Sequence, residues 1–415
     1  MSLPVIHLTS LDEFQAAAAL WDDLWHRSDA KSPTLRGSLT AQWVAHFGTN
    51  HTRKPTNDSF RALVVDQGGR WVAGLPLVGS RVAKMLRAGA WPANEWSDSG
   101  DLLLDPDVVP QPVLDALAGA IALLPWSLLR LADVPIDTDR WQQVLAAFER
   151  ADIPFHFRPE MQPGRIDTQG PWDTYCQSLS RRHRQQMVRH LRKLGERGRV
   201  ELQLLDQLRP DEVETWLSIG FEIENRGWKG ARGTSVMQTP GMFAFYLEQA
   251  QELARFGELE LALLTLDDRP IAFAYGMCAK GVYRSYKVGY DPQFAQYSPG
   301  QLLRYRLLER FFHDGRHRAI EYITPTPAHA QWRPKPYRVG RLLIAPPTWF
   351  GRRLVTVAGM PQFRPQKSAL PGVRGKGMTS RMLAMPVMNW IVRSRPSPKP
   401  ACGTVPWRRR SRYHQ

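Results

Sequence analysis

The strongest constraint on the fold is an arrangement of apolar runs and turns that occurs twice in the chain. The segment SFRALVVDQGGRWVAGLPLV, residues 59–78, has two β-rich runs separated by Gly-Gly, which predicts a hairpin. The segment LELALLTLDDRPIAFAYGM, residues 259–277, predicts a second hairpin with Asp-Asp at its turn. Both hairpins carry an Arg-x-apolar-Ala element, at Arg70–Ala73 and at Arg269–Ala272.

The segments that follow the two hairpins also correspond. A strand ends at Asp-Pro in LLLDPDVVPQP (residues 102–112) and in KVGYDPQFAQYSP (residues 287–299). In both cases a further proline precedes a helical run, at residues 113–124 and 302–312, and another strand-like segment follows. We therefore predict an α/β (α+β) protein of two similar halves, each a mixed, mostly antiparallel sheet flanked by helices.

Charge is distributed unevenly along the chain. The formal net charge is +16, but residues 346–415 hold fourteen Arg and Lys and no acidic residue, which leaves 16 − 14, or +2, for the rest. This composition predicts a nearly neutral globular body with a basic, Pro/Arg-rich and mostly disordered tail. Within the tail, MLAMPVMNWIV (residues 382–392) is apolar and is a candidate for contact with a membrane surface or a partner.

Several function classes find no support in the sequence. The three cysteines, Cys176, Cys278 and Cys402, lie far apart and form neither a metal-binding spacing nor a disulfide framework. The histidines show no HExxH or paired ligand spacing, so we predict no metal. The N-terminus lacks the pattern of a secretory signal, and no apolar run approaches the length of a membrane span. We expect a cytoplasmic protein.

The second half opens with a strongly basic helix. After a junction near residues 161–172, Ser178 or Ser180 can cap a helix whose apolar residues are expected on one face and whose arginines cover the others. The apolar residues are Met187, Val188, Leu191 and Leu194. A strand (VELQLL), a helix opened by Asp211, the loop RGWKGARGTS and a further helix then lead to the second hairpin.

The turn Ser298-Pro299-Gly300 has two interpretations. Serine suits a helix cap, proline suits the first turn, and glycine lets another group approach the backbone closely. A helix N-terminus also presents free N–H groups and a positive dipole, which suit a phosphate or pyrophosphate. The turn is therefore either an ordinary helix start or a phosphate-binding site. It lacks the GxxxxGK[ST] and GxGxxG patterns that would indicate ATP or NAD.

The order of elements over residues 172–326 resembles the GNAT acyltransferase family. The resemblance is closest to its CelD-like branch, which is related to FemAB-type tandem proteins. It is carried by SLSRRHRQQMVRHLRKL, by ENRGWKGARGT (residues 224–234), by RPIAFAYG and by YKVGYDPQFAQYSPGQLL. In that family, the strand before the glycine turn and the helix after it form a wedge that holds acyl-CoA.

The resemblance implies specific donor contacts. Acyl-CoA, such as acetyl-CoA, would lie with its phosphates near Ser298, Gly300, Gln301 and Leu302, and its pantetheine near the strand that contains Tyr286 and Lys287. The turn has one glycine where the family usually has more, which leaves individual phosphate contacts open. The first half has Pro110-Gln111-Pro112 at the equivalent place, without glycine and with two residues that donate no N–H. We therefore expect the first half to bind no CoA and to serve as scaffold or acceptor wall.

Acyl transfer to an amine requires a positioned thioester, a base for the amine and an acid for the leaving thiolate. Glu222 and Glu224 are candidate bases, with a solvated helix end as the alternative. Tyr290 is the candidate acid by resemblance, with a packed strand aromatic as the alternative.

The acceptor site is predicted from charged and aromatic side chains. Residues Arg226, Trp228 and Lys229 of the RGWKG loop are expected to shape it, and Asp291 either binds the acceptor or only ends its strand. The arginines Arg181, Arg182 and Arg184 are candidates for an anionic acceptor or the CoA 3′-phosphate, and otherwise form a solvated helix face.

The resemblance implies three segments: residues 1–165 as a degenerate GNAT-like half, residues 166–345 as the acyl-CoA-binding half, and residues 346–415 as the basic tail. The predicted function is acyl-CoA-dependent N-acylation of an amine on a sugar, an amino acid or a cell-envelope or polysaccharide precursor. A close alternative is FemAB-like transfer from aminoacyl-tRNA. Another is a catalytically silent module that binds nucleic acid or anionic membrane, such as the inner face of the membrane, through the tail.

Overall fold

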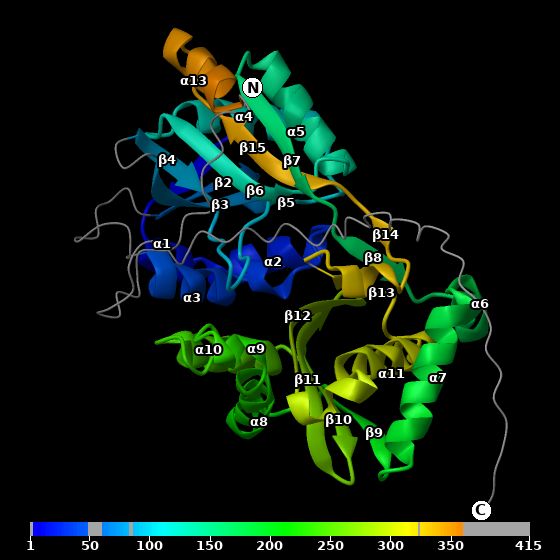
Figure 1. Cartoon of the computed structure of the whole chain (residues 1–415). Helices are drawn as coiled ribbons and strands as arrows, with labels where there is room; N and C mark the ends of the chain where they lie inside the picture. Colours follow the sequence, from blue (N-terminus) through cyan, green and yellow to red (C-terminus); the bar gives the residue numbers. More distant parts are fainter. Residues whose placement is uncertain (1–2, 49–59, 83–85, 323, 360–415) are drawn as a thin grey trace, which may run out of the picture. The chain divides into compact units, whose positions relative to one another are not determined.

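The computed structural model describes residues 3–48, 60–82, 86–322 and 324–359, and these residues form two mixed β-sheets with flanking helices (Figure 1). The first sheet has the order β1-β2-β3-β4-β6-β15-β7, with β5 paired to β3. The second has the order β14-β8-β13-β12-β11-β10-β9. The predicted fold class, two α/β halves with mixed and mostly antiparallel sheets, is confirmed.

The first sheet is built around the first predicted hairpin. Strands β2 (Phe60–Gln67) and β3 (Arg70–Val82) pair antiparallel, while β4 (Leu86–Ala90) and β6 (Leu128–Val134) are parallel neighbours. The helical run after Asp-Pro is α4 (Pro110–Ala122), which packs on β2 and β3. The other elements of this half are β1 (Val5–Leu8), α1 (Leu11–Ala16), α2 (Ala18–Arg27), η1 (Pro33–Leu35), α3 (Gly37–Phe47), β5 (Leu103–Leu104), α5 (Asp139–Arg150) and β7 (Phe155–Met161).

The second sheet repeats this plan. The second hairpin is β10 (Leu259–Leu266) and β11 (Arg269–Ala279), and β12 (Val282–Tyr290) continues it. The helix α11 (Pro299–Asp314) then leads into β13 (Ala319–Tyr322), which is parallel to β12. The remaining elements are β8 (Gly164–Asp167), α6 (Trp172–Ser178), α7 (Arg181–Gly195), β9 (Val200–Leu205), α8 (Val213–Arg226), α9 (Trp228–Ala231), α10 (Met242–Arg255), η3 (Pro292–Tyr297), α12 (Pro327–Ala330) and β14 (Lys335–Pro336).

The chain returns to the first sheet after finishing the second. Strand β15 (Val339–Ile344) pairs antiparallel with both β6 and β7, so it lies inside the first sheet. The division at residues 165 and 345 therefore does not follow the sheets, because β8 lies in the second sheet and β15 in the first. As a division into domains, the three predicted segments remain a prediction.

The start of the predicted disordered tail is helical. Residues Trp349–Gly359 form α13, and Val355 packs against Ala88, Leu128 and Leu343 of the first sheet. The expectation of disorder from residue 346 is therefore wrong for this segment, because its apolar residues pack against the first sheet. Residues 360–415, including the apolar stretch 382–392, lie outside the described residues. No helix among the described residues is long and apolar enough to cross a membrane.

One hydrophobic core joins the two halves. It contains Trp21, Trp25 and Trp43 from α2 and α3 together with residues of α8, α10, β10 and β11. At its edge the Arg36 guanidinium lies between the rings of Trp25 and Phe256 and forms a two-point ion pair with Glu258, at 2.9 and 2.7 Å. The first half is thus packed against the second through an apolar core.

Candidate active site

The strand β12 is paired on both edges over only half of its length. Its residues pair with β11 along the whole strand, from Val282 to Tyr290. On the other edge, pairing with β13 among the described residues covers Val282–Ser285, and its last pair is Ser285–Tyr322. The residues from Tyr286 to Tyr290 therefore have no strand partner on this edge among the described residues, and a strand edge of this kind can pair with an extended ligand.

A β-bulge marks the point where β12 and β13 part. Tyr275 pairs with Lys287 and Gly276 pairs with Ser285, so Tyr286 is the additional residue. The Tyr286 side chain packs against the core that joins the halves, and its buried hydroxyl has no hydrogen-bond partner among the described residues. The bulge thus places an unpartnered hydroxyl beside the unpaired part of the strand.

Lys287 points toward the first half rather than toward the glycine turn. Its ammonium lies 5.0 Å from the ring centre of Trp96 and 5.5 Å from that of Tyr246. Burial, and secondarily the charge of Lys229, lower the pKa of Lys287 to about 8. Near neutral pH a fraction of this side chain is therefore an uncharged amine.

The turn before α11 is fixed by Asp291. This residue is buried; its Oδ1 accepts a hydrogen bond from the Gln293 amide and its Oδ2 pairs with Arg269 at 3.0 Å. Ser298 is the N-cap of α11 but has φ 53°, and its hydroxyl makes no capping hydrogen bond. The expectation of a serine side-chain cap is therefore wrong, because this left-handed conformation turns the hydroxyl away from the first-turn amides.

The first turn of α11 leaves one amide unused. The N–H groups of Gln301 and Leu302 both donate to the Ser298 carbonyl, and Pro299 has no N–H. The Gly300 N–H has no acceptor among the described residues. A methyl group at Gly300 would lie 3.6 Å from Tyr290 Cδ1, an ordinary contact, so protein packing does not require glycine at this position.

The other predicted donor contacts lie deeper. Gln301 Oε1 accepts a hydrogen bond from the Trp332 indole at 2.7 Å. The Leu302 side chain is fully buried in the core beneath α11. These two side chains therefore face the protein interior, whereas Gly300 lies at the end of the unpaired part of β12, near Tyr290 and Val288.

The predicted catalytic residues separate into different environments. Tyr290 is 40% exposed at the end of β12, next to Gly300. Glu222 is exposed on α8. Glu224 is 3% exposed, pairs with the Lys229 ammonium and accepts a hydrogen bond from the Val236 amide at 3.1 Å. Glu224 has the contacts of a structural anchor.

The acceptor-loop residues are partly engaged with each other. Arg226 Nε lies 3.4 Å from Asp291, and Lys229 pairs with Glu224. Trp228 is 59% exposed with the Arg232 guanidinium 5.2 Å from its ring centre. The loop therefore surrounds the end of β12, since Asp291 follows that strand directly, and it leaves one large aromatic surface open.

The basic helix α7 carries a groove of about 490 Å³ on its exposed side. Arg181 and Arg184 contribute to it, while the exposed Arg182 does not. Val188 is 62% exposed, so its predicted place on the apolar face is wrong; His183 and His190 are buried instead. The lining residues are Arg181, Arg184, Gln185, Val188, Arg189 and Arg192.

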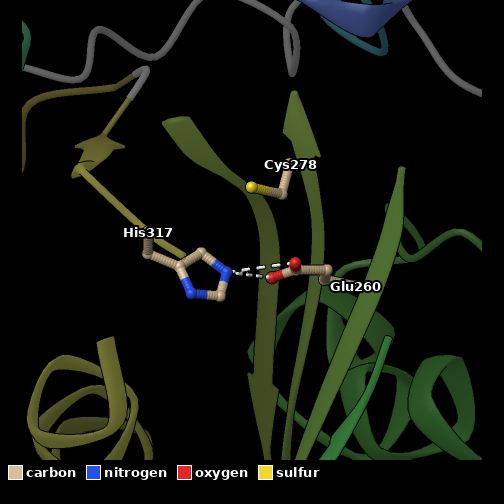
Figure 2. Close-up of side chains that lie close together, drawn as sticks. All are labelled: Glu260, Cys278 and His317. Atoms are coloured by element: carbon tan, nitrogen blue, oxygen red, sulfur yellow. Dashed lines mark hydrogen bonds and ion pairs between the residues drawn. The ribbon is translucent and has the colours of Figure 1, made fainter. Parts of the chain in front are cut away.

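A separate polar cluster lies at the opposite end of β12. Figure 2 shows Glu260, Cys278 and His317, whose ligand-type atoms lie within 4.8 Å of one another. The His317 Nε2 atom lies 2.9 Å from Glu260 Oε2, and Arg316 donates to Glu260 Oε1 at 2.8 Å. Burial raises the pKa of the Cys278 thiol well above its ordinary value, which favours the protonated form.

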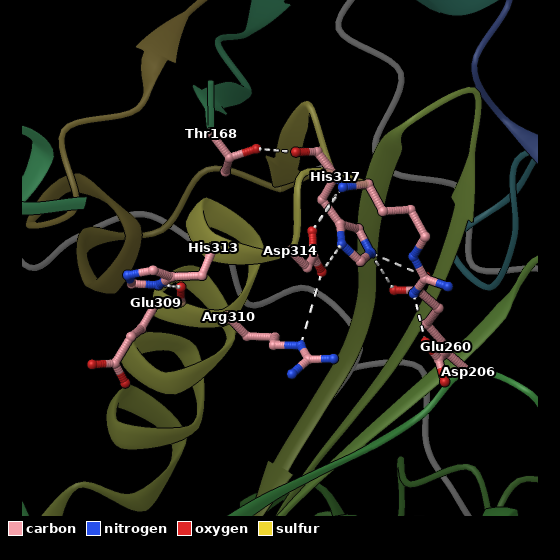
Figure 3. A network of polar contacts seen from close by, with 9 residues as sticks. Thr168, Asp206, Glu260, Glu309, Arg310, His313, Asp314 and His317 are labelled. Atoms are coloured by element: carbon pink, nitrogen blue, oxygen red, sulfur yellow. Dashed lines mark hydrogen bonds and ion pairs between the residues drawn. The ribbon is translucent and has the colours of Figure 1, made fainter. Parts of the chain in front are cut away.

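This cluster continues into a wider hydrogen-bonded network (Figure 3). The His317 Nδ1 atom lies 2.6 Å from Asp314 Oδ2, and the His317 carbonyl accepts a hydrogen bond from Thr168. Because Glu260 already has two cationic or imidazole partners, a metal ion would have to displace them. The cluster links α11, β10 and β8, and the prediction of no metal remains a prediction.

Sequence reasoning missed two features of this region. One is that Lys287 faces the first half. The other is Arg304, which is 8% exposed in α11. The sequence did indicate that Arg304 is buried, because it interrupts the apolar face of α11. Its neighbours on that face, Leu303, Leu307 and Leu308, are buried.

Comparison with known proteins gives a family for part of the chain. Residues 181–331 match the family model described as an acetyltransferase (GNAT) domain. No curated protein matches the sequence.

Solved structures resemble a larger part of the chain. FemX is 10% identical and has a TM-score of 0.53, covering 86% of this chain and 100% of its own. At this identity the similarity shows the fold alone. A tandem GNAT protein from the clavulanic acid biosynthesis pathway is 14% identical with a TM-score of 0.41, covering 83% of this chain and 99% of its own. The C-terminal domain of a putative lysylphosphatidylglycerol synthetase from Agrobacterium fabrum is 11% identical with a TM-score of 0.47, covering 85% and 99%.

Proposed function

We propose that this chain, whose residues 181–331 form a GNAT-type acetyltransferase domain, is an acyl-CoA-dependent N-acyltransferase. The observation that carries the proposal is the segment Tyr286–Tyr290 of β12, which has a strand partner on one edge only among the described residues and ends beside the Gly300 amide. An extended pantetheine arm, which contains amide groups, can pair with such a strand edge, and a phosphate can accept from a helix-start amide.

The donor contacts divide between backbone and side chains. The Gly300 N–H, which has no acceptor among the described residues, suits a pyrophosphate oxygen, and Tyr286 and Val288 lie along the proposed path of the arm. Ser298, Gln301 and Leu302 contribute through the turn they form rather than through exposed side chains. This binding mode needs no metal for donor binding.

The acceptor is proposed to approach from the side of the first half. Lys287, Trp96 and Tyr246 meet there, and the exposed Trp228 and Glu222 lie on the neighbouring loop and helix. Tyr290 is the proposed acid toward the leaving thiolate. Glu222, or the uncharged form of Lys287, is the proposed base for the amine, while Glu224 holds Lys229 in place.

The acceptor class remains the amine of a sugar, an amino acid or a cell-envelope or polysaccharide precursor. An aromatic and cationic wall of this kind suits a polar, anionic acceptor that carries an amine. The proposed location is cytoplasmic or peripheral at the inner face of a membrane, where the basic tail would meet anionic lipid or nucleic acid.

Isothermal titration of the full chain with acetyl-CoA tests the proposal directly. We expect saturable binding with a dissociation constant in the micromolar to submillimolar range. Absence of binding at millimolar acetyl-CoA would refute the donor assignment.

One observation favours a second candidate, transfer from aminoacyl-tRNA. The arginine groove of α7 lies on a helix that packs against η3, the segment just before the glycine turn, so a nucleic-acid backbone could reach the same turn. Binding of charged tRNA that weakens steeply with salt, together with no response to acetyl-CoA, would favour this candidate over the first.

A further inference from the structure

Arg304 is a buried cation that has no counter-ion among the described residues. The described part of the chain has three buried arginines, Arg36, Arg140 and Arg304. Arg36 pairs with Glu258 at 2.7 Å, and Arg140 pairs with Asp29 and Asp101, both at 2.8 Å. Arg304 forms no ion pair with any described carboxylate.

The contacts of Arg304 are too few for its five N–H donors. Its Nη1 lies 3.4 Å from Gln301 Oε1, a long hydrogen bond to an oxygen that already accepts from Trp332 at 2.7 Å. Its guanidinium lies 4.9 Å from the ring centre of Tyr322, the last residue of β13. Arg304 therefore reaches the place where β12 and β13 part, because Tyr322 is the final partner of Ser285.

Other polar groups around Arg304 are also unsatisfied. The buried Tyr322 hydroxyl lies near the Arg304 guanidinium and has no other hydrogen-bond partner among the described residues. His183 Nε2 is buried without a partner there as well; because His183 Nδ1 faces the acceptor Gln331 Oε1 at 3.0 Å, Nε2 of the neutral ring is an acceptor. His183 contacts the Trp332 ring edge-on, at a centroid distance of 4.5 Å. Burial, and to a smaller extent the positive charge of Arg304, lower the pKa values of His183 and His329. The region thus carries a positive charge that no described carboxylate compensates, and its spare donors are the N–H groups of Arg304.

A buried guanidinium without a counter-ion raises the free energy of the folded protein unless an anion binds it. Removing a guanidinium from water without a carboxylate costs several kcal/mol in real proteins, and native structures rarely leave buried donors unused. Arg304 also lies four residues after Gly300, so the two positions are neighbours on one helix face. An arginine side chain leans toward the helix N-terminus, which here is the turn with the free amide.

We propose that Arg304, with the Tyr322 hydroxyl, binds an anionic oxygen group of the acyl donor, a phosphate or an acyl-chain carboxylate. The inference rests on the proposed function. It adds a side chain that would select the acyl donor to a site whose other proposed donor contacts are made by backbone groups. The two sources of the anion make different predictions. A phosphate would make Arg304 equally important for every acyl-CoA, whereas a carboxylate would make it important only for dicarboxylic acyl donors.

The first measurement concerns the protein without ligand. Replacing an uncompensated buried charge by an apolar group of similar length should leave Tm unchanged or raise it, so we expect R304M to melt at or above the wild-type temperature. R140M, which leaves Asp29 and Asp101 without their partner, is the contrast and should melt several degrees lower. A clear fall in Tm for R304M would overturn the proposal, because it would assign Arg304 a structural role.

The second measurement is titration of wild type, R304M and R304K with CoA, acetyl-CoA, succinyl-CoA and inorganic pyrophosphate. If the anion is phosphate, R304M should bind CoA, acetyl-CoA and pyrophosphate at least tenfold more weakly, and R304K should recover part of the loss. If it is a carboxylate, only succinyl-CoA binding should fall. R306M, on the same helix with Arg306 paired to Glu309 at 2.7 Å, is the matched control and should bind as wild type.

The outcomes separate this inference from the proposed function. Equal affinity of wild type and R304M for all four probes would overturn the role of Arg304 while leaving the acyltransferase assignment intact. Arg304-dependent binding of pyrophosphate by a protein that ignores every CoA ester would support the anion site and refute the donor assignment.

Discussion

The two halves begin their equivalent helices in opposite ways. Helix α4 starts at Pro110 after Val109, which is 71% exposed, and a second proline at position 112 removes another amide. Helix α11 starts after a left-handed Ser298 and has a free glycine amide in its first turn. The sixth residue of α4 is Asp115, which pairs with Arg150 on the surface, whereas the sixth residue of α11 is the unpaired Arg304.

The comparison teaches that topology and site chemistry are separable. Both halves share the order hairpin, strand, helix, strand, yet only α11 has a glycine in its first turn and a buried arginine as its sixth residue. In the first half Gln111 stands at the position of Gly300 and Pro112 follows it, while Asp115, at the position of Arg304, pairs with Arg150. The proposed site thus depends on a few residues of α11 and its first turn, whereas the two sheets share one plan.

The largest effect is expected for a side chain placed in the donor turn. G300E should reduce acetyl-CoA affinity at least 100-fold by titration, because a carboxylate would occupy and repel the proposed phosphate position. The melting temperature should change little, since a Cβ at this position makes only ordinary contacts, with Tyr290 at 3.6 Å and Val288 at 3.9 Å.

G119E is the matched control in the first half. Gly119 is exposed on α4 with open space around its Cα, so the same substitution should leave acetyl-CoA affinity unchanged. Equal effects of G300E and G119E would contradict the assignment of the donor turn to α11.

The next effect concerns the proposed acid. Y290F should lower kcat about 10- to 100-fold with little change in acetyl-CoA affinity, because it removes one proton-transfer group and keeps the ring. Steady-state kinetics checks this prediction. The control is Y297F, in the η3 segment between Tyr290 and α11. A kcat within twofold of wild type would remove Tyr290 from the mechanism.

The two candidate glutamates should separate by stability and rate. E224Q should lower the free energy of unfolding by about 1–3 kcal/mol, because Lys229 loses its buried carboxylate partner. E222Q, on the exposed side of α8, should leave denaturant stability unchanged and lower kcat if Glu222 is the base. A loss of stability in E222Q together with a stable E224Q would reverse these roles.

A smaller effect is expected on the acid side of the pH profile. Burial, aided by the charge of Arg304, lowers the pKa of His329 from 6.5 to about 4. The unfolded chain therefore binds more protons than the folded protein between these values, and stability should fall as pH drops from 6.5 to 4.

Partial exposure of His329 limits its contribution to about 1–2 kcal/mol. H329Q should flatten the profile in this window, as measured by urea denaturation at several pH values. A saturating anion near Arg304 should flatten it too, because it would raise the His329 pKa. An H329Q profile parallel to that of wild type would exclude His329 as the source.

The smallest effect concerns the helix starts themselves. V109D supplies the capping carboxylate that α4 lacks and should add about 1 kcal/mol to the free energy of unfolding. S298G removes the cost of a left-handed serine and should be neutral or stabilising by less than about 1 kcal/mol. Destabilisation by V109D would show that the first half needs its apolar helix start.

Much of the fold was predictable because local patterns and tertiary structure agree. The hairpins, the Asp-Pro strand ends and the helices after them were found from turn chemistry and periodicity. The exposure of Val188 and the burial of His183 were not predicted. Periodicity shows which side of a helix is apolar, but it does not show which residues at the border of that side are covered by the rest of the protein. Strand β15 escaped prediction, since nothing local shows which sheet a strand near residue 340 will join.

The site was predictable in outline only. The Gly300 turn and Tyr290 could be located because glycine, proline and aromatic residues mark them in sequence. The anchoring roles of Glu224 and Asp291 depend on partners 5 to 65 residues away, such as Lys229, Val236 and Arg226 in the chain, and no spacing rule encodes those ion pairs. Arg304 was overlooked because an arginine in a helix is ordinarily solvated, and only the three-dimensional fold shows that it lacks a counter-ion.

The position of β15 has a consequence for how the protein is made. Strands β6 and β7 are synthesised early, but the strand that lies between them is Val339–Ile344, which leaves the ribosome roughly 180 residues after β7. Until then one edge of β6 and one edge of β7 lack their strand partner. The second half must leave the ribosome before β15 can pair with both and complete the first sheet. The order of synthesis therefore makes the first half, although it comes first in the chain, the last to be completed, and truncation before residue 344 should yield an aggregation-prone product rather than a free-standing N-terminal domain.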